Sequence, residues 1–463
     1  MTAKNPKYLH PAIILLLLGL QSCSLAVKPD LERLYRQNRE VRQPPVVLIH
    51  GLMGSRLKEA DSGKEVWVGN LAKLLFSNYA ETALEIDPQT LLPKASPLVA
   101  SGLLDHVVGK DFYASITDTL ETAGRYQRAE PGVPQSAGSR NYYVLVYDWR
   151  QDNVQTARKL SRFIEQIRLD YADPELKVDL VAHSMGGLIA RYYLRYGEQD
   201  TLDDNNFDVN LHGAERVRRV ILLGTPNLGS VSALHTFIRG FKIGARAVPT
   251  ETLVTMPSTY QLFPHALNDW IVTAAGKPLR RDLFDVEIWR RFQWSIFDPR
   301  VRTRIKGRFD NEADGTAYLE LLERYFEKHL ERARRFTWSL TVPLPEQPYK
   351  LIVLGGDCKL TPARVVVEEV NGISEIRLWP REIRHPLAAV DYNQVMLEPG
   401  DGTVTKASLL ARESLDPSIP RHKWVSFPLD YPIFLCESHY NLTGNATFQD
   451  NLLHTLLSLD SDD

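Results

Sequence analysis

The pattern of apolar and polar positions predicts short buried strands that alternate with amphipathic helices along most of the chain. Strand signals, mostly runs of aliphatic residues, occur at 46–49, 142–147, 178–181, 219–223, 350–354 and 422–427. Apolar residues at helical spacing occur at 154–169, from residue 186 onward, and again at 316–336. This alternation is typical of a mostly parallel sheet with helices on its faces. The sequence therefore predicts an α/β fold.

The spacing of these signals also divides the chain into parts. No clear sheet strand is predicted between residues 231 and 341, so we expect a helical cap or lid there. The sheet-forming core would then consist of residues 44–230, with a small insertion at about 59–104, and of residues 342–463. A core interrupted by a large helical insertion is thus the predicted architecture.

A candidate nucleophile stands where the third predicted strand meets a predicted helix. The sequence Ala182-His-Ser-Met-Gly186 differs in one residue from the Gly-x-Ser-x-Gly nucleophile elbow of serine hydrolases. Small residues at 182 and 186 would fit a turn so tight that it lifts the Ser184 hydroxyl out of the chain. Gly197 is placed to end the helix. A serine in an ordinary turn is the alternative, but a strand before it and a helix after it favour Ser184 as nucleophile.

The loop after the first predicted strand is a candidate oxyanion hole. In α/β-hydrolases this loop supplies one backbone N–H to the tetrahedral intermediate, and the residue after the nucleophile supplies another. The two donors here would be the amides of Leu52 and Met185. Gly51 would let the backbone come close to the intermediate, while His50 and Gly186 would support the loop and the elbow.

The acid and the base of a catalytic triad are expected after the serine, in the order Asp or Glu and then His. Asp401 lies between two glycines, in a sharp turn that would present one carboxylate. His439 is expected on a loop before a final helix, where it would take the proton from Ser184 while Asp401 orients its ring. Other candidates are Asp357 and Asp391 for the acid, and His385, His422 and His454 for the base. His183 is interpreted as structural.

The N-terminus predicts export and attachment to a membrane. Lysines precede the apolar run 11–20, which is too short to span a bilayer but has the layout of a secretory signal. Leu20-Gln-Ser-Cys23 is similar to a bacterial lipobox with Cys23 as the acylated residue, so 1–22 would be the signal peptide and 23–43 a tether. The predicted location is the bacterial cell envelope at the outer membrane, facing the periplasm or the cell surface. A plain signal peptide and an uncleaved anchor are the alternatives.

Composition and charge narrow the range of partners. The chain carries 55 basic and 57 acidic residues, a formal net charge of -2, which argues against a nucleic-acid partner. The sequence has no zinc spacing, calcium loop or glycine-rich phosphate loop, so no metal and no cofactor is predicted. Cys358 and Cys436 are compatible with a disulfide and equally with two free thiols. No feature of the sequence predicts an oligomeric state.

These motifs resemble the lecithin:cholesterol acyltransferase-like branch of the α/β-hydrolases, which includes lysosomal-type phospholipase A and bacterial relatives. The matching segments are Val47-Leu-Ile-His-Gly-Leu-Met-Gly-Ser-Arg-Leu57, Tyr147-Asp-Trp-Arg150, Ala182-His-Ser-Met-Gly-Gly187, Gly224-Thr-Pro-Asn-Leu-Gly-Ser230, Met256-Pro-Ser-Thr-Tyr-Gln-Leu-Phe-Pro264, Gly400-Asp-Gly-Thr-Val404 and Ser438-His439. The resemblance implies an α/β-hydrolase fold with Ser184, Asp401 and His439 as triad and Leu52 and Met185 as oxyanion donors. The chain departs from the family pattern at Ala182, where Gly is usual, and at His50, where many eukaryotic members carry Pro.

Lipid is the substrate class that the resemblance and the predicted membrane tether favour. We expect a serine-dependent acyl hydrolase or O-acyltransferase that takes acyl groups from phospholipid through an acyl-enzyme. The alternatives are a neutral-glyceride lipase or carboxylesterase, and a surface lipoprotein that binds lipid without catalysis.

In the predicted cap, Trp289 and Trp294 are interleaved with Arg290 and Arg302. These side chains would either contact lipid headgroups, or form a cap with its aromatic rings inward and its arginines in solvent.

Overall fold

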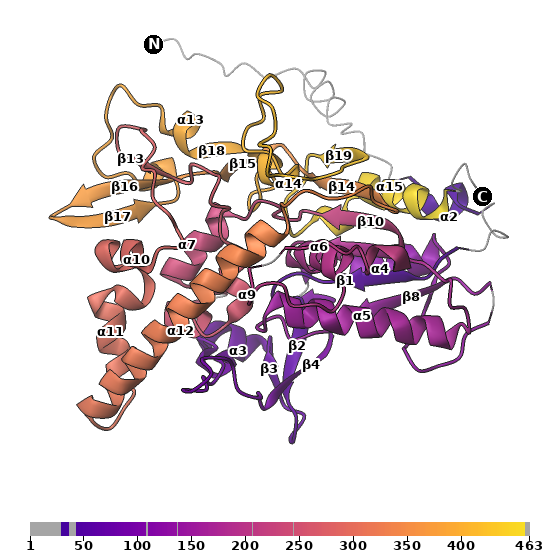
Figure 1. Ribbon diagram of the computed structural model, residues 1–463, viewed down its shortest axis with the longest axis horizontal. Helices are drawn as coiled ribbons and strands as arrows, with labels where there is room; N and C mark the ends of the chain where they lie inside the picture. Colours follow the sequence, from indigo (N-terminus) through magenta and orange to yellow (C-terminus); the bar gives the residue numbers. More distant parts are fainter. Residues whose placement is uncertain are drawn as a thin grey trace, which may run out of the picture.

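A computed structural model describes residues 29–36, 43–107, 110–136, 138–205, 207–243 and 245–458. At its centre, seven strands form one parallel sheet in the order β19–β14–β10–β9–β1–β8–β7 (Figure 1). The strands are β1 (Val46–Ile49), β7 (Gln127–Arg128), β8 (Asn141–Leu145), β9 (Val178–His183), β10 (Val217–Leu223), β14 (Lys350–Gly356) and β19 (Tyr431–Leu435). The predicted α/β class with a mostly parallel sheet is therefore confirmed.

Successive side chains of a strand point to opposite faces of the sheet, and both faces are buried here because helices pack on each of them. The helices that cover it are α4 (Ala114–Thr122), α5 (Asn153–Asp170), α6 (Met185–Tyr196) and α15 (Ala446–Leu457). In β1, Val46 and Leu48 share a core with α4 and α15, while Val47 and Ile49 share a core with α5 and α6. Burial on both faces explains why the inner strands are continuous aliphatic runs in the sequence.

One predicted strand is wrong. Residues 422–427 form no strand, and the edge strand beside β14 is β19. Val425 and Phe427 are buried, but they anchor a loop to the core instead of entering the sheet. β19 contains Pro432, which has no N–H to donate and is tolerated because this strand lies at the edge of the sheet. β19 begins with two exposed residues, one of them a proline, so it is not a run of aliphatic residues and the sequence pattern does not predict it.

The segment 231–341 lies outside the central sheet and is mainly helical. Its helices are α7 (Val231–Arg239), α8 (Thr250–Leu253), α9 (Pro257–Tyr260), α10 (Val286–Phe292), α11 (Pro299–Lys306) and α12 (Glu312–Ser339). Its strands are β11 (Phe241–Ile243) and β12 (Arg246–Val248), which form a hairpin, and β13 (Ile271–Thr273). β13 pairs with β16 (Val365–Val370), which pairs with β17 (Ile373–Arg377), so segments far apart in the chain share one small sheet (Figure 1).

The two tryptophans singled out in this segment, Trp289 and Trp294, point inward. Trp289 is fully buried, and Trp294 is buried beside it with the two rings perpendicular at 5.9 Å. Arg290 and Arg302 stay partly exposed and reach the carboxylate of Glu323 on α12. Of the two interpretations of these side chains, inward packing of the aromatic rings is therefore the one that the structure shows.

Two further groups of elements surround the core. The insertion after β1 contains β2 (Ser55–Glu59), β3 (Glu65–Trp67), α3 (Leu71–Phe76) and β4 (Leu98–Leu103), with β2 paired to both other strands. The segment after β14 contains β15 (Lys359–Pro362), α13 (Tyr392–Met396), β18 (Leu397–Gly400) and α14 (Lys406–Leu409), with β15 paired to β18. The turn after β18 begins at Asp401, so this segment delivers the predicted acid.

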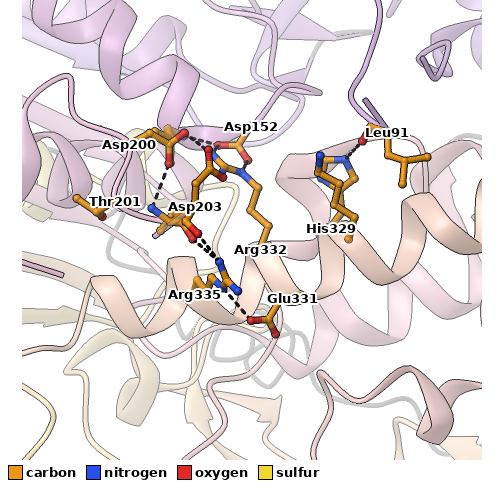
Figure 2. Close-up of polar contacts among 12 residues, drawn as sticks. Leu91, Asp152, Asp200, Thr201, Asp203, His329, Glu331, Arg332 and Arg335 are labelled. Carbon is orange, nitrogen blue, oxygen red and sulfur yellow. Dashed lines mark hydrogen bonds and ion pairs between the residues drawn. The ribbon is translucent and has the colours of Figure 1, made fainter. Parts of the chain in front are cut away.

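Helix α12 ties the cap to the core through Arg332, which Figure 2 shows among three carboxylates. Its guanidinium lies 2.7 Å from Asp152 at the start of α5, 2.8 Å from Asp200 and 3.0 Å from Asp203. About one turn earlier, Nε2 of His329 lies 3.1 Å from a backbone carbonyl oxygen of the insertion after β1. Helix α12, itself part of the segment 231–341, therefore contacts both the insertion after β1 and the core.

The predictions for the N-terminus fall largely outside the described residues. The signal peptide at 1–22 and the acylated Cys23 lie there, and of the tether only 29–36 and residue 43 are described, with Leu31–Leu34 forming the short helix α2. Across the described ranges, no helix combines the length and the apolar character needed to cross a membrane. Lipid attachment at Cys23 stays a prediction.

Candidate active site

Ser184 stands at the sharp turn between β9 and α6. The strand ends at His183, the helix begins at Met185, and Gly197 follows its last residue as predicted. The Ser184 backbone has φ 54° and ψ -123°, a conformation that is costly for a residue with a side chain. In α/β-hydrolases a strained turn of this kind exposes the nucleophile at the carboxyl ends of the parallel strands.

The turn can be tight because the residues two positions before and after the serine, Ala182 and Gly186, are small. Ala182 is fully buried in β9. A Cβ on Gly186 would lie 2.5 Å from the carbonyl oxygen of His50 and 2.6 Å from that of Ile49. Since real Cβ atoms do not come so close to backbone oxygens, α6 can lie against the end of β1 only with glycine at this position.

We expect the Gly186→Ala variant to lose about 1–3 kcal/mol of the free energy of unfolding, because the added methyl group overpacks against strand backbone. Gly102→Ala is the matched control, since a Cβ there meets no atom within 4 Å. Urea unfolding of both variants beside the parent protein measures the difference. Equal stability of the two variants would show that α6 can move away from β1 without cost.

Three polar side chains from distant parts of the chain meet at this turn. Nδ1 of His439 lies 2.7 Å from Oδ2 of Asp401, and Nε2 of the same ring lies 3.0 Å from Oγ of Ser184. Asp401 is 2% exposed and His439 is 4% exposed, so both are shielded from bulk water. The contacts form one chain of hydrogen bonds from a carboxylate to a hydroxyl.

The turn after β18 fixes the Asp401 carboxylate. Its Oδ1 accepts hydrogen bonds from the N–H groups of Thr403 at 2.9 Å and Val404 at 2.7 Å, which leaves Oδ2 for His439. Burial alone would raise the pKa of Asp401, but the facing His439 ring and these hydrogen bonds outweigh it and lower the pKa. The carboxylate is therefore ionised at neutral pH and can orient the imidazole.

The other candidate acids contact other groups, and the other candidate bases lie exposed at the surface. Asp357 forms an ion pair with Lys406, and Asp391 caps the start of α13. The three other candidate bases are exposed: His385, His422 and His454. Within the described ranges, no group of three or more His, Cys, Asp or Glu side chains is arranged to hold a metal ion.

The loop after β1 lies directly beside the serine. A Cβ on Gly51 would come within 2.8 Å of the Ser184 Cβ, so this approach needs glycine. In the part of the chain that the structure describes, no protein acceptor pairs with the amide of Leu52 on this loop or of Met185 at the start of α6. Two such N–H groups beside a nucleophile can stabilise negative charge on a substrate oxygen.

His50 supports this loop. Its buried ring stacks on Tyr147 at 4.0 Å, and burial lowers its pKa to about 4, so the ring is neutral. The Tyr147 N–H faces Nε2 at 3.5 Å, which assigns the proton to Nδ1, and Nδ1–H donates to the Gly51 carbonyl at 2.8 Å. Because that carbonyl and the Leu52 N–H belong to one peptide unit, His50 sets the direction of the Leu52 amide.

Cys358 and Cys436 form a disulfide, which settles the pairing that the sequence leaves open. Their Cα atoms are 5.0 Å apart and 78 residues separate them in the chain. Cys436 directly follows β19 and precedes His439, while Cys358 lies just after β14. The bond therefore ties the loop that carries His439 to the neighbouring strand end.

Comparison with known proteins finds one family whose model matches part of the chain. The lecithin:cholesterol acyltransferase family matches residues 138–295, which contain β8, the serine turn and much of the cap. An uncharacterized protein of Saccharomyces cerevisiae, YJR098C, is 24% identical over 255 residues, which cover 53% of this chain. The chain spans only 33% of the length of that relative.

Two solved structures align with most of the chain. The crystal structure of a Tle4–Tli4 complex aligns with a TM-score of 0.54 at 17% identity, over 89% of this chain and 98% of that chain. The mature Bacillus licheniformis lipase BlEst2 aligns at 13% identity over 90% and 93% of the two chains, with a TM-score of 0.33 that is too low for a structural argument. The family match and the parallel sheet together show an α/β-hydrolase fold that is similar to the lecithin:cholesterol acyltransferase family over residues 138–295.

Proposed function

We propose that the chain is a serine-dependent lipid acyl hydrolase or O-acyltransferase that works through an acyl-enzyme. The observation that carries the proposal is the chain of hydrogen bonds from Asp401 through His439 to Ser184. Enzymes on several unrelated folds use this arrangement to transfer acyl groups. A protein that only binds lipid has no use for a strained serine held against a buried imidazole.

In the first half of the reaction, Nε2 of His439 takes the proton from the Ser184 hydroxyl as Oγ attacks the ester carbonyl. The carbonyl oxygen becomes an oxyanion, and the amides of Leu52 and Met185 are positioned to bind it. When the tetrahedral intermediate collapses, the bond to the leaving alcohol breaks and His439 gives its proton to that alcohol. The acyl group is then bound to Ser184 as an ester.

In the second half, an acceptor hydroxyl attacks the acyl-enzyme. His439 takes the acceptor's proton, and the same two amides hold the new oxyanion. When this second tetrahedral intermediate collapses, His439 returns the proton to Ser184 and the acyl group is released. The product is a free fatty acid if the acceptor is water, and an ester if the acceptor is a lipid alcohol. The choice between them depends on how well the cap, segment 231–341, keeps water from the acyl-enzyme.

Phospholipid is the proposed acyl donor. The matched family is named for acyl transfer from lecithin to cholesterol, which makes a phospholipid ester the first substrate class to test. We further propose that the chain meets this substrate at a membrane surface to which an acylated Cys23 tethers it in the bacterial envelope. An acyl anchor contributes roughly 0.8 kcal/mol per buried methylene to such attachment.

We expect purified protein incubated with phospholipid vesicles that contain a sterol to release lysophospholipid in step with a second product. The second product is fatty acid if water accepts the acyl group, and sterol ester if the sterol does. Mass spectrometry of the extracted lipids measures both, and Ser184→Ala is the matched control. Turnover in that control is expected to fall by roughly 10⁶-fold, below detection.

The outcomes separate the remaining alternatives. If phospholipid stays intact but neutral glycerides are hydrolysed by the parent protein alone, the chain is a glyceride lipase. If no ester is hydrolysed and a fluorophosphonate probe does not label Ser184, the proposal of catalysis is wrong and a lipid-binding lipoprotein takes its place. Equal activity of the parent protein and Ser184→Ala would assign the chemistry to another residue.

A further inference from the structure

A buried pair of polar side chains, Tyr113 and His183, lies beside the proposed triad and belongs to none of its steps. Tyr113 directly precedes α4 and is 4% exposed, while His183 is the last residue of β9 and is 8% exposed. Burying two polar groups in the apolar interior costs free energy unless each finds partners. Their partners lie on the two loops that flank Ser184.

Two contacts connect the pair to these loops, and a third joins the two members of the pair. The N–H of Gly51 donates to the Tyr113 hydroxyl oxygen at 2.8 Å, and that oxygen lies 2.8 Å from Nδ1 of His183. On the far side of the ring, Nε2 of His183 faces the backbone carbonyl oxygen of His439 at 3.4 Å. The series therefore runs from the loop after β1, through the strand end that carries the nucleophile, to the loop that carries the base.

The direction of each hydrogen bond follows from the donors available. Burial, with the nearby His439 as the next cause, lowers the pKa of His183 to about 3, so the neutral ring has one N–H. The Tyr113 oxygen accepts from Gly51, and its own hydrogen has Nδ1 of His183 as an acceptor. The remaining proton is then on Nε2, where it points at the His439 carbonyl. In the opposite tautomer, Nε2 and that carbonyl would face each other as two acceptors.

We propose that Tyr113 and His183 are positioning residues that hold the Gly51 loop and the His439 loop in fixed register around Ser184. The inference deepens the proposed function and rests on it. Gly51 has no side chain, so only hydrogen bonds to its backbone can restrain it. The peptide unit before it is held by Tyr113 at the N–H and by Tyr147, whose hydroxyl donates to the His50 carbonyl at 2.6 Å.

Loss of the Tyr113 hydroxyl removes one of the two hydrogen bonds that hold that peptide unit, and it leaves His183 without its donor. The Leu52 amide can then drift from the oxyanion, and an error of about 1 Å in such a position costs up to about 100-fold in rate. Because these amides act mainly on the transition state, the loss should appear in kcat and not in KM. A residue that only stabilises the fold would not divide the two constants in this way.

The test compares Tyr113→Phe with Tyr126→Phe. Tyr126 is buried in the same apolar cluster, but its hydroxyl has no hydrogen-bond partner among the described residues. With a soluble short-chain ester, we expect Tyr113→Phe to lower kcat and the rate of fluorophosphonate labelling by about 10- to 100-fold, with KM within about twofold. Tyr126→Phe should match the parent protein in all three values.

A second pair of variants decides the question if Tyr113→Phe does not fold. In His183→Asn the amide oxygen takes the place of Nδ1 and can accept from Tyr113, whereas the similarly sized leucine in His183→Leu cannot. We expect the asparagine variant to retain about tenfold more kcat than the leucine variant, since it leaves fewer buried groups unpaired. Equal loss in both would overturn the positioning role.

Different variants test the positioning role of Tyr113 and the proposed triad, so the two can fail separately. If Tyr113→Phe keeps the kcat and labelling rate of Tyr126→Phe while Ser184→Ala is inactive, the positioning role is wrong and the triad stands. A lower melting temperature with unchanged kcat leads to the same conclusion. If Ser184→Ala hydrolyses the ester as well as the parent protein does, the proposed triad is wrong and the positioning role falls with it.

Discussion

Replacing Asp401 with asparagine is expected to lower kcat by roughly 10⁴-fold while the protein stays folded. The two N–H groups of Thr403 and Val404 that donate to Oδ1 require an acceptor at that position. The amide oxygen of asparagine must therefore occupy it, and the amide NH₂ then faces His439. Nδ1 of His439 becomes the acceptor, its proton moves to Nε2, and Nε2 can no longer take a proton from Ser184.

Asp357→Asn is the matched control for this variant. Asp357 is also an aspartate next to a strand end, but its carboxylate pairs with Lys406 and lies partly in solvent. We expect its kcat to stay within about twofold of the parent value. Steady-state hydrolysis of a soluble ester measures both variants, and thermal unfolding shows that each is folded. A large loss in Asp357→Asn with little change in Asp401→Asn would move the acid to the other position.

The parts of the site that the sequence predicts are those fixed by neighbouring residues. The turn at Ser184 needs a strand, small residues and a helix within one short stretch, and all of these can be read locally. The inner strands are equally visible, because burial on both faces demands uninterrupted aliphatic runs. Asp401 and His439 were placed by their order along the chain, and the structure brings both within hydrogen-bond distance of their predicted neighbours.

The parts of the site that the sequence does not predict depend on contacts between residues far apart in the chain. Tyr113 is 62 residues from Gly51 and 70 from His183, and nothing in the sequence around it indicates either contact. The interpretation of His183 as structural could not anticipate that its ring links the two loops of the site. The sequence leaves the pairing of Cys358 and Cys436 open for the same reason, since a disulfide depends on a Cα separation that only the fold sets.

A second variant addresses the cap, and its expected effect is on stability. Replacing Arg332 with alanine is expected to lower the free energy of unfolding by about 3–5 kcal/mol, because it leaves a buried carboxylate without its counter-charge. That carboxylate, Asp152, has a side chain only 5% exposed. It also caps α5 by accepting from the Val154 N–H, and it accepts from the Gln261 side chain, so it cannot turn out to solvent without further loss.

The effect should depend on pH in a defined direction. Burial alone would raise the pKa of Asp152, but Arg332 outweighs burial and lowers the pKa in the folded protein. In the parent protein, the stability that this carboxylate contributes is therefore present above its unfolded pKa and is lost as pH falls through the folded pKa. In the Arg332→Ala variant, burial raises the pKa of Asp152. This carboxyl group therefore becomes protonated as pH falls, and the variant no longer carries an unpaired buried charge. The stability difference between the two proteins should be largest near about pH 7 and narrow toward about pH 4.

Two controls separate the lost charge from lost packing. Arg334→Ala removes an exposed ion pair with Glu331 on the same helix and should cost only about 0–1 kcal/mol. In an Asp152→Asn background the buried carboxylate at position 152 is absent, and asparagine still caps α5, so Arg332→Ala should cost much less there than in the parent protein. Urea unfolding of these variants across the pH range measures each difference. An undiminished cost in the asparagine background would assign the stability to packing of the Arg332 side chain and not to the ion pairs between α12 and the core.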